Sequence, residues 1–158
     1  MTYVIHGAQG YMGREVLKLL AVRQPDLEPV LVDKNTDCEQ IWPSLTAWGG
    51  TPDCIIDFSH HSATRELTDY ALRTGASLVL ATTGQTPEEL ELIRQAAKQV
   101  PVFFASNMSL GIAVLIRMAQ LAAAAFPEAD IEIVETHHNR KLDAPSGTAI
   151  MKIGRAHV

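Results

Sequence analysis

Short apolar runs alternate with amphipathic stretches along most of this chain. The apolar runs predict strands at residues 3–6, 29–33, 54–58, 78–81, 102–105 and 131–135. Helical periodicity and start signals predict helices over residues 12–22, from 59 to before 75, from 86 onward and from 109 onward. Strands that alternate with helices are typical of a parallel sheet covered by helices on both faces. The predicted fold class is therefore α/β, with a doubly wound parallel sheet.

Capping residues mark several of these boundaries. Ser59 is the expected N-cap of the second predicted helix, and Gly75 is expected to end that helix. Thr86 is the expected N-cap of the next helix, because Pro87 follows at the first helical position. The polar segment 34–52 contains two tryptophans but shows only weak periodicity, so no regular element is predicted there.

Composition narrows the class of protein. With 158 residues, 47% hydrophobic and 20% charged, the chain has the make-up of a soluble globular protein. A net charge of −5 argues against a general nucleic-acid partner. Cys38 and Cys54 are too few for a disulfide framework, which favours a reduced, cytoplasmic setting. The apolar stretch 110–126 carries Arg117 at its centre and is short for a membrane span, so a buried helix is expected instead.

A glycine-rich segment, Gly7-Ala-Gln-Gly-Tyr-Met-Gly13, lies between the first strand and the first helix. A helix N-terminus there can bind a pyrophosphate, and Asp33 at the end of the next strand can accept hydrogen bonds from an adenosine ribose. Lys34 can receive a 2′-phosphate, so NADH and NADPH are both possible cofactors. The alternatives are a tight strand–helix turn without a ligand and, for Lys34, an ordinary surface lysine.

Small polar loops follow two more strands at the same expected sheet edge. They are Ala81-Thr82-Thr83-Gly84 and Ala105-Ser106-Asn107-Met108. Such residues would let a nicotinamide ring and its ribose approach the backbone, although they are also common in caps and turns. His60 and His61 follow the third strand on that edge, where solvated first-turn residues are the expected interpretation and a ligand role is the alternative.

A second motif, residues 135–149, contains His137, His138 and Lys141 directly after the last predicted strand. One of the two histidines is expected to face a cleft, where it can donate a proton at neutral pH. Lys141 suits a carboxylate, and the segment 145–148 is expected to open a helix whose N–H groups and Thr148 hydroxyl bind a second carboxylate. The motif therefore suits a small dicarboxylate substrate. The alternatives are a polar loop with a helix cap and, less well matched in ligand spacing, a zinc site.

Together these two motifs resemble those of the dihydrodipicolinate reductases (4-hydroxy-tetrahydrodipicolinate reductases) of the diaminopimelate route to lysine, over residues 3 to about 152. The resemblance implies a Rossmann-like fold, an NAD(P)H-dependent reduction, His137 and Lys141 as catalytic residues, and substrate binding by His138, Gly147 and Thr148. It implies a cofactor site formed by Gly7, Ala8, Gln9, Gly10, Tyr11, Met12, Asp33, Lys34, Ala81, Thr82, Thr83, Ala105, Ser106, Asn107 and Met108. Ala81 departs from the glycine that family members often carry.

The resemblance also sets the expected domain organisation. Residues 1–108 are expected to form the dinucleotide-binding domain, and residues 109–152 to begin an α+β substrate-binding and assembly domain that makes the complete protein a homotetramer. Members of this family continue for many more residues, so we expect a C-terminally truncated chain with a non-native tail at 153–158. A cofactor-binding fragment without turnover remains the alternative function. A different amino-acid dehydrogenase on the same fold fits the histidine motif poorly.

Overall fold

The computed structural model describes residues 1–36, 38–137, 139 and 145–150, and it divides the chain into two compact units, Met1–Ala105 and Ser106–Val158. The first unit is a six-stranded parallel sheet with strand order β3-β2-β1-β4-β5-β6. Its strands are β1 (Tyr3–His6), β2 (Val30–Val32), β3 (Ile41–Trp42), β4 (Cys54–Asp57), β5 (Ser77–Leu80) and β6 (Val102–Phe104). The predicted doubly wound α/β fold is confirmed.

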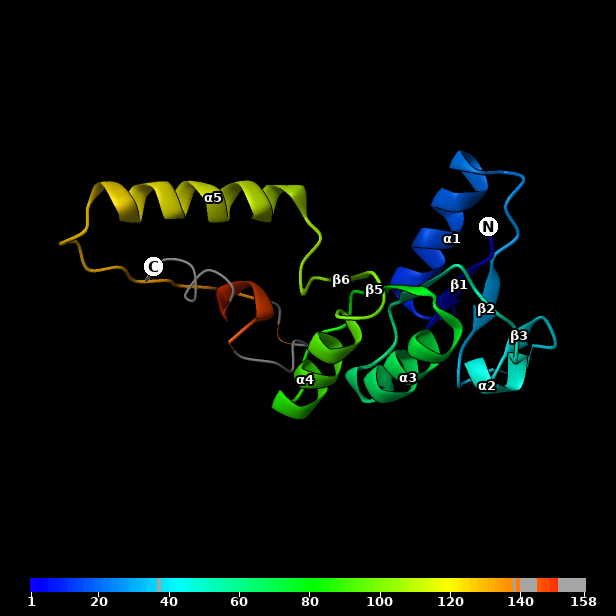
Figure 1. Cartoon of the computed structure of the whole chain (residues 1–158). Coiled ribbons are helices and arrows are strands. Elements are labelled where there is room, and N and C mark those ends of the chain that lie inside the picture. Colours follow the sequence, from blue (N-terminus) through cyan, green and yellow to red (C-terminus); the bar gives the residue numbers. More distant parts are fainter. Residues whose placement is uncertain (37, 138, 140–144, 151–158) are drawn as a thin grey trace. The chain divides into compact units, whose positions relative to one another are not determined.

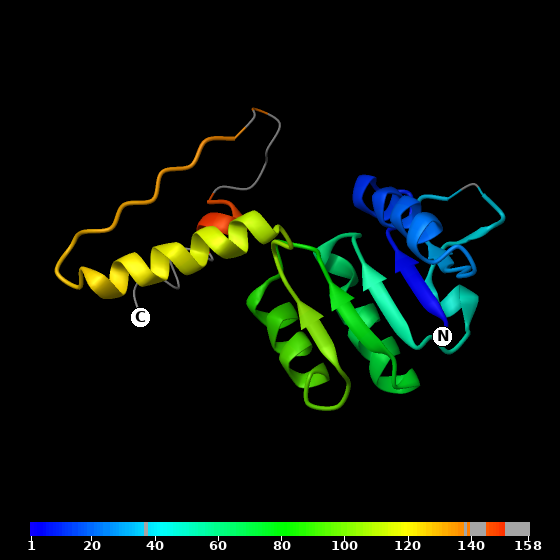
Figure 2. The same cartoon turned by 90° about the horizontal axis from the view of Figure 1, so that it is seen from above.

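Helices cover both faces of this sheet. Helix α1 (Tyr11–Arg23) lies on one face, and the other face carries α2 (Leu45–Trp48), α3 (Thr64–Thr74) and α4 (Pro87–Ala96) (Figures 1 and 2). The chain moves from β1 outward to β3, returns to β4 and then moves outward to β6. This reversal next to β1 creates a topological switch point, the place where doubly wound folds bind ligands.

The core of the first unit lies between the sheet and the helices α3 and α4. Val4, Ile55, Leu78 and Leu80 from the strands are fully or almost fully buried, as is Leu67 from α3. β1 is buried at consecutive positions, Val4 and Ile5, whereas β4 and β5 bury alternate residues against this core. This core holds the carboxyl ends of β1, β2 and β4 rigidly beside one another.

The capping residues predicted for α4 and for the end of α3 are confirmed, whereas the one predicted for the start of α3 is wrong. Thr86 Oγ1 accepts a hydrogen bond from the Glu89 N–H, and the Glu89 carboxylate accepts one from the Thr86 N–H, which is a complete capping box. Gly75 ends α3 with a positive φ of 76°, as predicted. Ser59 is not a helix cap, because a 3₁₀ turn, η1 (His61–Ala63), precedes α3 and is capped by the His60 side chain.

Loss of the α4 capping box is expected to destabilise the first unit. Thr86→Ala should lower the free energy of unfolding by about 1 kcal/mol, because an N–H in the first turn loses its acceptor. Thr83→Ala is the matched control, since Thr83 is an exposed threonine of the same connection. Denaturant unfolding followed by circular dichroism measures both, and an equal loss for the two variants would contradict this assignment.

The Glu89 carboxylate also ties the start of α4 to η1. Its oxygen atoms lie 2.8 and 3.1 Å from Nδ1 of His61, and the pKa of Glu89 is lowered mainly by the hydrogen bond from the Thr86 backbone. A lowered carboxyl pKa stabilises the fold at neutral pH. We expect this stabilisation to be lost in acid, as the pH falls below the ordinary glutamate pKa of 4.5 and then through the lowered pKa of Glu89. Glu89→Gln should therefore lower the melting temperature at pH 7, and the difference from the parent chain should shrink in acid.

The second unit contains α5 (Leu110–Ala125), which begins at the predicted N-cap Ser109. The strand predicted at 131–135 is wrong, since the described residues 127–137 contain no strand. An apolar pattern favours an extended backbone, but a strand also requires a paired neighbour, and none lies beside 131–135 among the described residues of this unit. No helix in the described part of the chain is long and apolar enough to cross a membrane.

Candidate cofactor site and catalytic motif

The glycine loop turns the chain sharply from β1 into α1. Gly7 has a φ of +79°, and its N–H donates to the Val32 carbonyl oxygen at 2.8 Å. A Cβ added at Gly7 would lie 2.8 Å from the Ser59 backbone, and one added at Gly13 would overlap the Gly7 carbonyl oxygen. Gly10 caps α1 without any side-chain hydrogen bond. The first turn of α1 therefore presents backbone N–H groups that no capping side chain covers.

Asp33 joins this loop to the end of β2. Its Oδ2 accepts a hydrogen bond from the Gln9 N–H at 2.9 Å, and its Oδ1 accepts one from the Asn35 N–H at 3.1 Å. The side chain is largely buried, so both contacts are protected from water. Each carboxylate oxygen retains a lone pair for a ligand hydroxyl. Asp33 is thus placed both to hold the loop and to contact a ribose.

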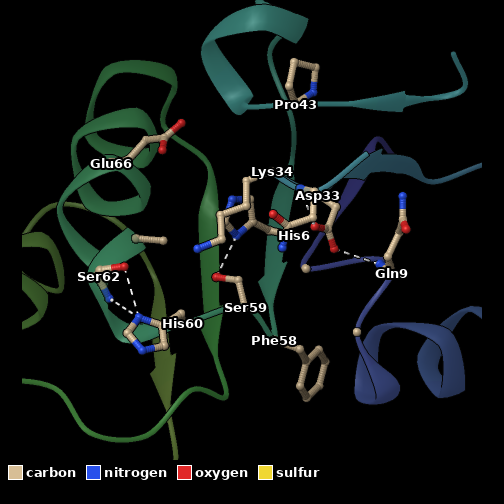
Figure 3. A pocket seen from close by; sticks show the side chains of 14 residues that line it. His6, Gln9, Asp33, Lys34, Pro43, Phe58, Ser59, His60, Ser62 and Glu66 are labelled. Atoms are coloured by element: carbon tan, nitrogen blue, oxygen red, sulfur yellow. Dashed lines mark hydrogen bonds between the residues drawn. The ribbon is translucent and has the colours of Figure 1, made fainter. Parts of the chain in front are cut away.

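A cavity of about 540 Å³ opens between the glycine loop and the segments that follow β2 and β4 (Figure 3). Glu66 and Lys34 contribute its charged rim, and Asp33 and His6 lie deeper. Its full lining is His6, Gly7, Gln9, Gly10, Asp33, Lys34, Asn35, Pro43, Phe58, Ser59, His60, Ser62, Ala63 and Glu66. The cavity lies at the carboxyl edge of the sheet, beside the topological switch point.

The cavity brings together only part of the predicted cofactor set. Gly7, Gln9, Gly10, Asp33 and Lys34 line it, as the sequence pattern suggested. The other three loop positions do not: Ala8 is buried beneath the loop, while Tyr11 is 80% exposed and Met12 is 48% exposed on the surface of α1. The side chains of these three residues thus do not line the cavity, and a contact between the cofactor and the backbone N–H groups at the start of α1 stays a prediction.

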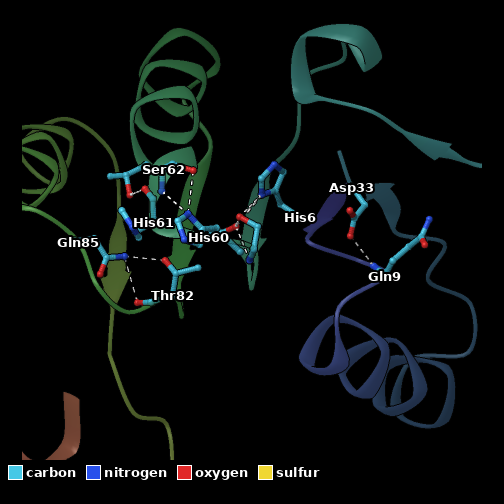
Figure 4. Close-up of polar contacts among 11 residues, drawn as sticks. His6, Gln9, Asp33, His60, His61, Ser62, Thr82 and Gln85 are labelled. Atoms are coloured by element: carbon cyan, nitrogen blue, oxygen red, sulfur yellow. Dashed lines mark hydrogen bonds and ion pairs between the residues drawn. The ribbon is translucent and has the colours of Figure 1, made fainter. Parts of the chain in front are cut away.

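The loops after β5 and β6 leave the sheet at the same edge but do not line this cavity. Thr82 is 7% exposed, and its hydroxyl and carbonyl oxygens accept hydrogen bonds from the Gln85 side chain at 2.7 and 3.2 Å (Figure 4). Ala105 donates its N–H to the Leu80 carbonyl oxygen, while Thr83 is exposed and Ala81 is half-buried. Their predicted contact with a nicotinamide ring stays a prediction.

The second unit positions part of the histidine motif. Residues 147–150 are helical, and the side-chain oxygen of Ser146 accepts from the Ala149 N–H. The Glu135 carboxylate accepts hydrogen bonds from both the N–H and the hydroxyl of Ser146. Asn107 Nδ2 donates to Thr148 Oγ1 at 2.7 Å. The structure therefore brings together Asn107, predicted to contact the cofactor, and Thr148, predicted to contact the substrate.

His137 lies beside the same carboxylate. Its Nδ1 is 3.6 Å from Oε2 of Glu135, and its side chain is 40% exposed. Gly147 is half-buried at the start of the short helix. The predicted roles of His138 and Lys141 fall on residues outside the described part of the chain.

Sequence reasoning missed the residues that form the floor and the far wall of the cavity. The sequence pattern predicts only a strand at His6 and a helix cap at Ser59, yet both residues line the cavity. Asp57, which contacts both of them, is completely buried. One sequence signal could have indicated this cluster: the apolar strands β1 and β4 each end in a polar residue. A buried polar group requires a hydrogen-bond partner, so two such residues at neighbouring strand ends are expected to interact. His60 lines the cavity and His61 does not.

A parallel sheet in this order, with a glycine loop, an acid at the end of β2 and a cavity between them, defines a dinucleotide-binding domain. The family model "Dihydrodipicolinate reductase, N-terminus" matches residues 1–108, and "Dihydrodipicolinate reductase, C-terminus" matches residues 111–157. The chain therefore belongs to the dihydrodipicolinate reductase family.

Individual relatives agree with this assignment. The 4-hydroxy-tetrahydrodipicolinate reductase of Caldanaerobacter subterraneus is 46% identical over 151 residues, which is 94% of this chain and 60% of that protein. The Campylobacter jejuni enzyme of the same name is 40% identical over 146 residues, which is 92% of this chain and 57% of that protein. This chain thus spans about 60% of the length of these curated relatives.

A solved structure shares the fold. The dipicolinate-bound dihydrodipicolinate reductase from Paenisporosarcina sp. TG-14 is 28% identical to this chain and superimposes with a TM-score of 0.73. The match covers 99% of this chain and 65% of the other.

Proposed function

We propose that this chain carries the nicotinamide-binding part, and the beginning of the substrate-binding part, of an NAD(P)H-dependent 4-hydroxy-tetrahydrodipicolinate reductase. The enzyme reduces this cyclic substrate to tetrahydrodipicolinate in the diaminopimelate route to lysine. The observation that carries the proposal is the cavity in which the glycine loop, Asp33 and Lys34 meet. The names of the relatives support the same activity. The two free cysteines support a reducing, cytoplasmic setting. The full-length protein is proposed to be a homotetramer.

The residues around the cavity fit a nicotinamide dinucleotide. An added Cβ at Gly10 would lie 3.2 Å from the Gly7 carbonyl oxygen, so a side chain at this position would crowd the loop. The N-terminus of α1 favours the negative pyrophosphate, because its free N–H groups point outward and the helix dipole is positive there. Asp33 would accept hydrogen bonds from ribose hydroxyl groups, and Lys34 would pair with a 2′-phosphate.

The histidine motif is proposed to bind and protonate the substrate. When bound, the reduced nicotinamide supplies a hydride to the substrate ring. Because the product lacks the 4-hydroxyl group of the substrate, that group leaves as water. His137 is proposed to donate a proton to the ring carbon or nitrogen that the hydride has made electron-rich, and Glu135 beside its Nδ1 gives the imidazolium form an anionic neighbour. Lys141, His138, Gly147 and Thr148 are proposed to hold the two carboxylates. The dipicolinate bound by the Paenisporosarcina relative is a dicarboxylate, which supports this assignment.

The alternative is a chain that binds the cofactor without turnover. It is favoured by the contrast between the two units: the first has a closed core, whereas α5 buries only Ile116 among its sixteen residues. The test compares the 158-residue chain with a completed chain, in which residues 1–152 are continued by the C-terminal part of the Caldanaerobacter relative. We expect both to bind NADH or NADPH and only the completed chain to oxidise it in the presence of substrate. Turnover by the 158-residue chain would favour the first function over the alternative.

The cofactor site is expected to accept both nicotinamide cofactors. Asp33 favours a 2′-hydroxyl and the adjacent Lys34 favours a 2′-phosphate, so the two preferences partly cancel. One charge pair of this kind contributes about 1–3 kcal/mol, so neither cofactor should be preferred by more than about a hundredfold. Calorimetric titration of NADH and NADPH into the completed chain measures this ratio. Undetectable binding of either one would contradict the prediction.

Lys34→Ala separates the two preferences. It should weaken NADPH binding by roughly tenfold or more and leave NADH binding nearly unchanged. Lys18→Ala is a suitable control, because Lys18 is an exposed lysine of α1 that pairs with Glu15 and does not line the cavity.

A further inference from the structure

A histidine at the floor of the cavity is not explained by the functions above. His6 ends β1, is 8% exposed and lines the same cavity as Lys34 (Figure 3). Its Nδ1 lies 2.7 Å from Oδ1 of Asp57 and 3.1 Å from Oγ of Ser59. Burying an imidazole ring costs free energy unless its nitrogen atoms form hydrogen bonds with the protein or with a ligand.

The hydrogen bonds around Asp57 determine which nitrogen of His6 carries a hydrogen. The Ser59 hydroxyl donates to Oδ1 of Asp57 at 2.6 Å, and the Ser59 N–H donates to the same oxygen at 3.1 Å. An ionised carboxylate only accepts, so Nδ1 of His6 must be a donor to Asp57. Nε2 forms no hydrogen bond with the described residues, which leaves it as the ring nitrogen available to a ligand.

The charges of this cluster favour an anionic ligand at Nε2. Asp57 is completely buried, and its Oδ2 has no hydrogen-bond partner among the described residues. A buried carboxylate requires a nearby positive charge, and the ring of His6 is the group in ion-pair contact with it. A bound anion would favour a proton on Nε2 as well as on Nδ1, and that second proton would give His6 a donor toward the ligand and an ion pair with Asp57.

The other charged groups of the cavity are Asp33, Lys34 and Glu66, with His60 as a further titratable group. Lys34 is exposed on the rim, whereas His6 is almost buried, so the two side chains would approach a ligand from different depths. A carbonyl or hydroxyl needs only one donor, but a phosphate has several anionic oxygens that can accept from both.

We propose that His6 is a cofactor-binding residue that donates its Nε2–H to a phosphate oxygen of the adenosine half of the cofactor, and that Asp57 is its positioning residue. This inference rests on the proposed function, because it assigns an additional contact in the same cavity. Both the 5′-diphosphate of NADH and the 2′-phosphate of NADPH have the required chemistry. The experiment below distinguishes these two sources.

His6→Asn is the informative variant. The amide nitrogen of asparagine can replace Nδ1 as a donor to Asp57, while the group equivalent to Nε2 is removed. The matched control is His61→Asn, because His61 is also a histidine paired through Nδ1 with a carboxylate, Glu89, but does not line the cavity. Denaturant unfolding of both variants shows whether each retains the parent fold.

Calorimetric titrations of the 158-residue chain with ADP and with 2′-AMP test the proposal. His6→Asn should weaken at least one of them by roughly tenfold, as expected for a hydrogen bond to a charged group. His61→Asn should change both by less than about twofold. A loss confined to ADP assigns His6 to the 5′-diphosphate, and a loss confined to 2′-AMP assigns it to the 2′-phosphate. Unchanged affinity for both probes in His6→Asn would overturn the proposal.

Nitrogen NMR of the histidine rings provides a second measurement that does not depend on a variant. Addition of ADP or 2′-AMP should shift the Nε2 resonance of His6, while the Nδ1 resonance should move little because Asp57 already holds that nitrogen. In Asp57→Asn the shift on ligand addition should shrink, since the ring loses its anionic partner. If the parent chain bound neither NADH, NADPH nor these probes, the proposed function would fail together with this inference. Binding without any response of His6 would overturn the inference alone.

Discussion

Replacing His137 with Gln in the completed chain is expected to lower kcat by roughly 10²–10⁴-fold and to change KM little. A general acid acts mainly in the transition state, so its loss reduces the rate of the chemical step more than substrate binding. Steady-state kinetics with saturating NADPH measures both constants. The position of His137 beside Glu135 in the second unit supports the choice of this residue as the proton donor.

Lys141→Ala provides the comparison within the same motif. It removes a positive charge that is proposed to hold a substrate carboxylate before as well as during the reaction, so both kcat and KM should deteriorate. An unchanged kcat in His137→Gln at every pH tested would show that the proton comes from another group.

Gly7→Ala is expected to disrupt the cofactor site far more than Gly75→Ala. The two glycines have almost the same positive φ, 79° and 76°, so alanine is strained by about 1–2 kcal/mol at either position. An added Cβ at Gly75 has nothing within 4 Å, whereas one at Gly7 would lie 2.8 Å from the Ser59 backbone. The difference between the two variants therefore isolates the steric effect.

We expect Gly7→Ala to lose about 1–3 kcal/mol more stability than Gly75→Ala, as overpacking against backbone does. NADPH affinity should fall by more than tenfold in Gly7→Ala, because the loop must shift away from Ser59, and should stay unchanged in Gly75→Ala. Thermal unfolding and calorimetric titration give both quantities. Equal stability and equal NADPH affinity of the two variants would show that close packing of this loop is unimportant.

The sequence predicted those parts of the fold that depend on local signals. The strand Tyr3–His6 and the start of α4 at Pro87 were located correctly, because an apolar run and a capping box each carry their own signal. The strand Ile41–Trp42 and helix Leu45–Trp48 were missed, since elements this short are too brief to show a period. The strand predicted at 131–135 is wrong although its apolar pattern is clear. A strand also needs a neighbouring strand to pair with, and the local sequence does not show whether one is present.

The sequence predicted those residues of the candidate site whose position relative to a strand is itself informative. Gly7, Gly10 and Asp33 were identified from their places after the first two strands, and they do line the cavity. His6 and Ser59 were missed because their importance comes from contacts with Asp57, which lies far away in the sequence and next to them in the sheet. Such clusters become visible only once strand order and register are known.

The most direct test of the cofactor assignment is a titration of NADH and NADPH into the 158-residue chain, followed by the fluorescence of Trp42 and Trp48. Both tryptophans belong to the first unit, and Trp42 immediately precedes the cavity residue Pro43. We predict saturable quenching by both cofactors in the parent chain and in Gly75→Ala, with strongly weakened binding in Gly7→Ala. A folded parent chain without saturable quenching by either cofactor would contradict the account.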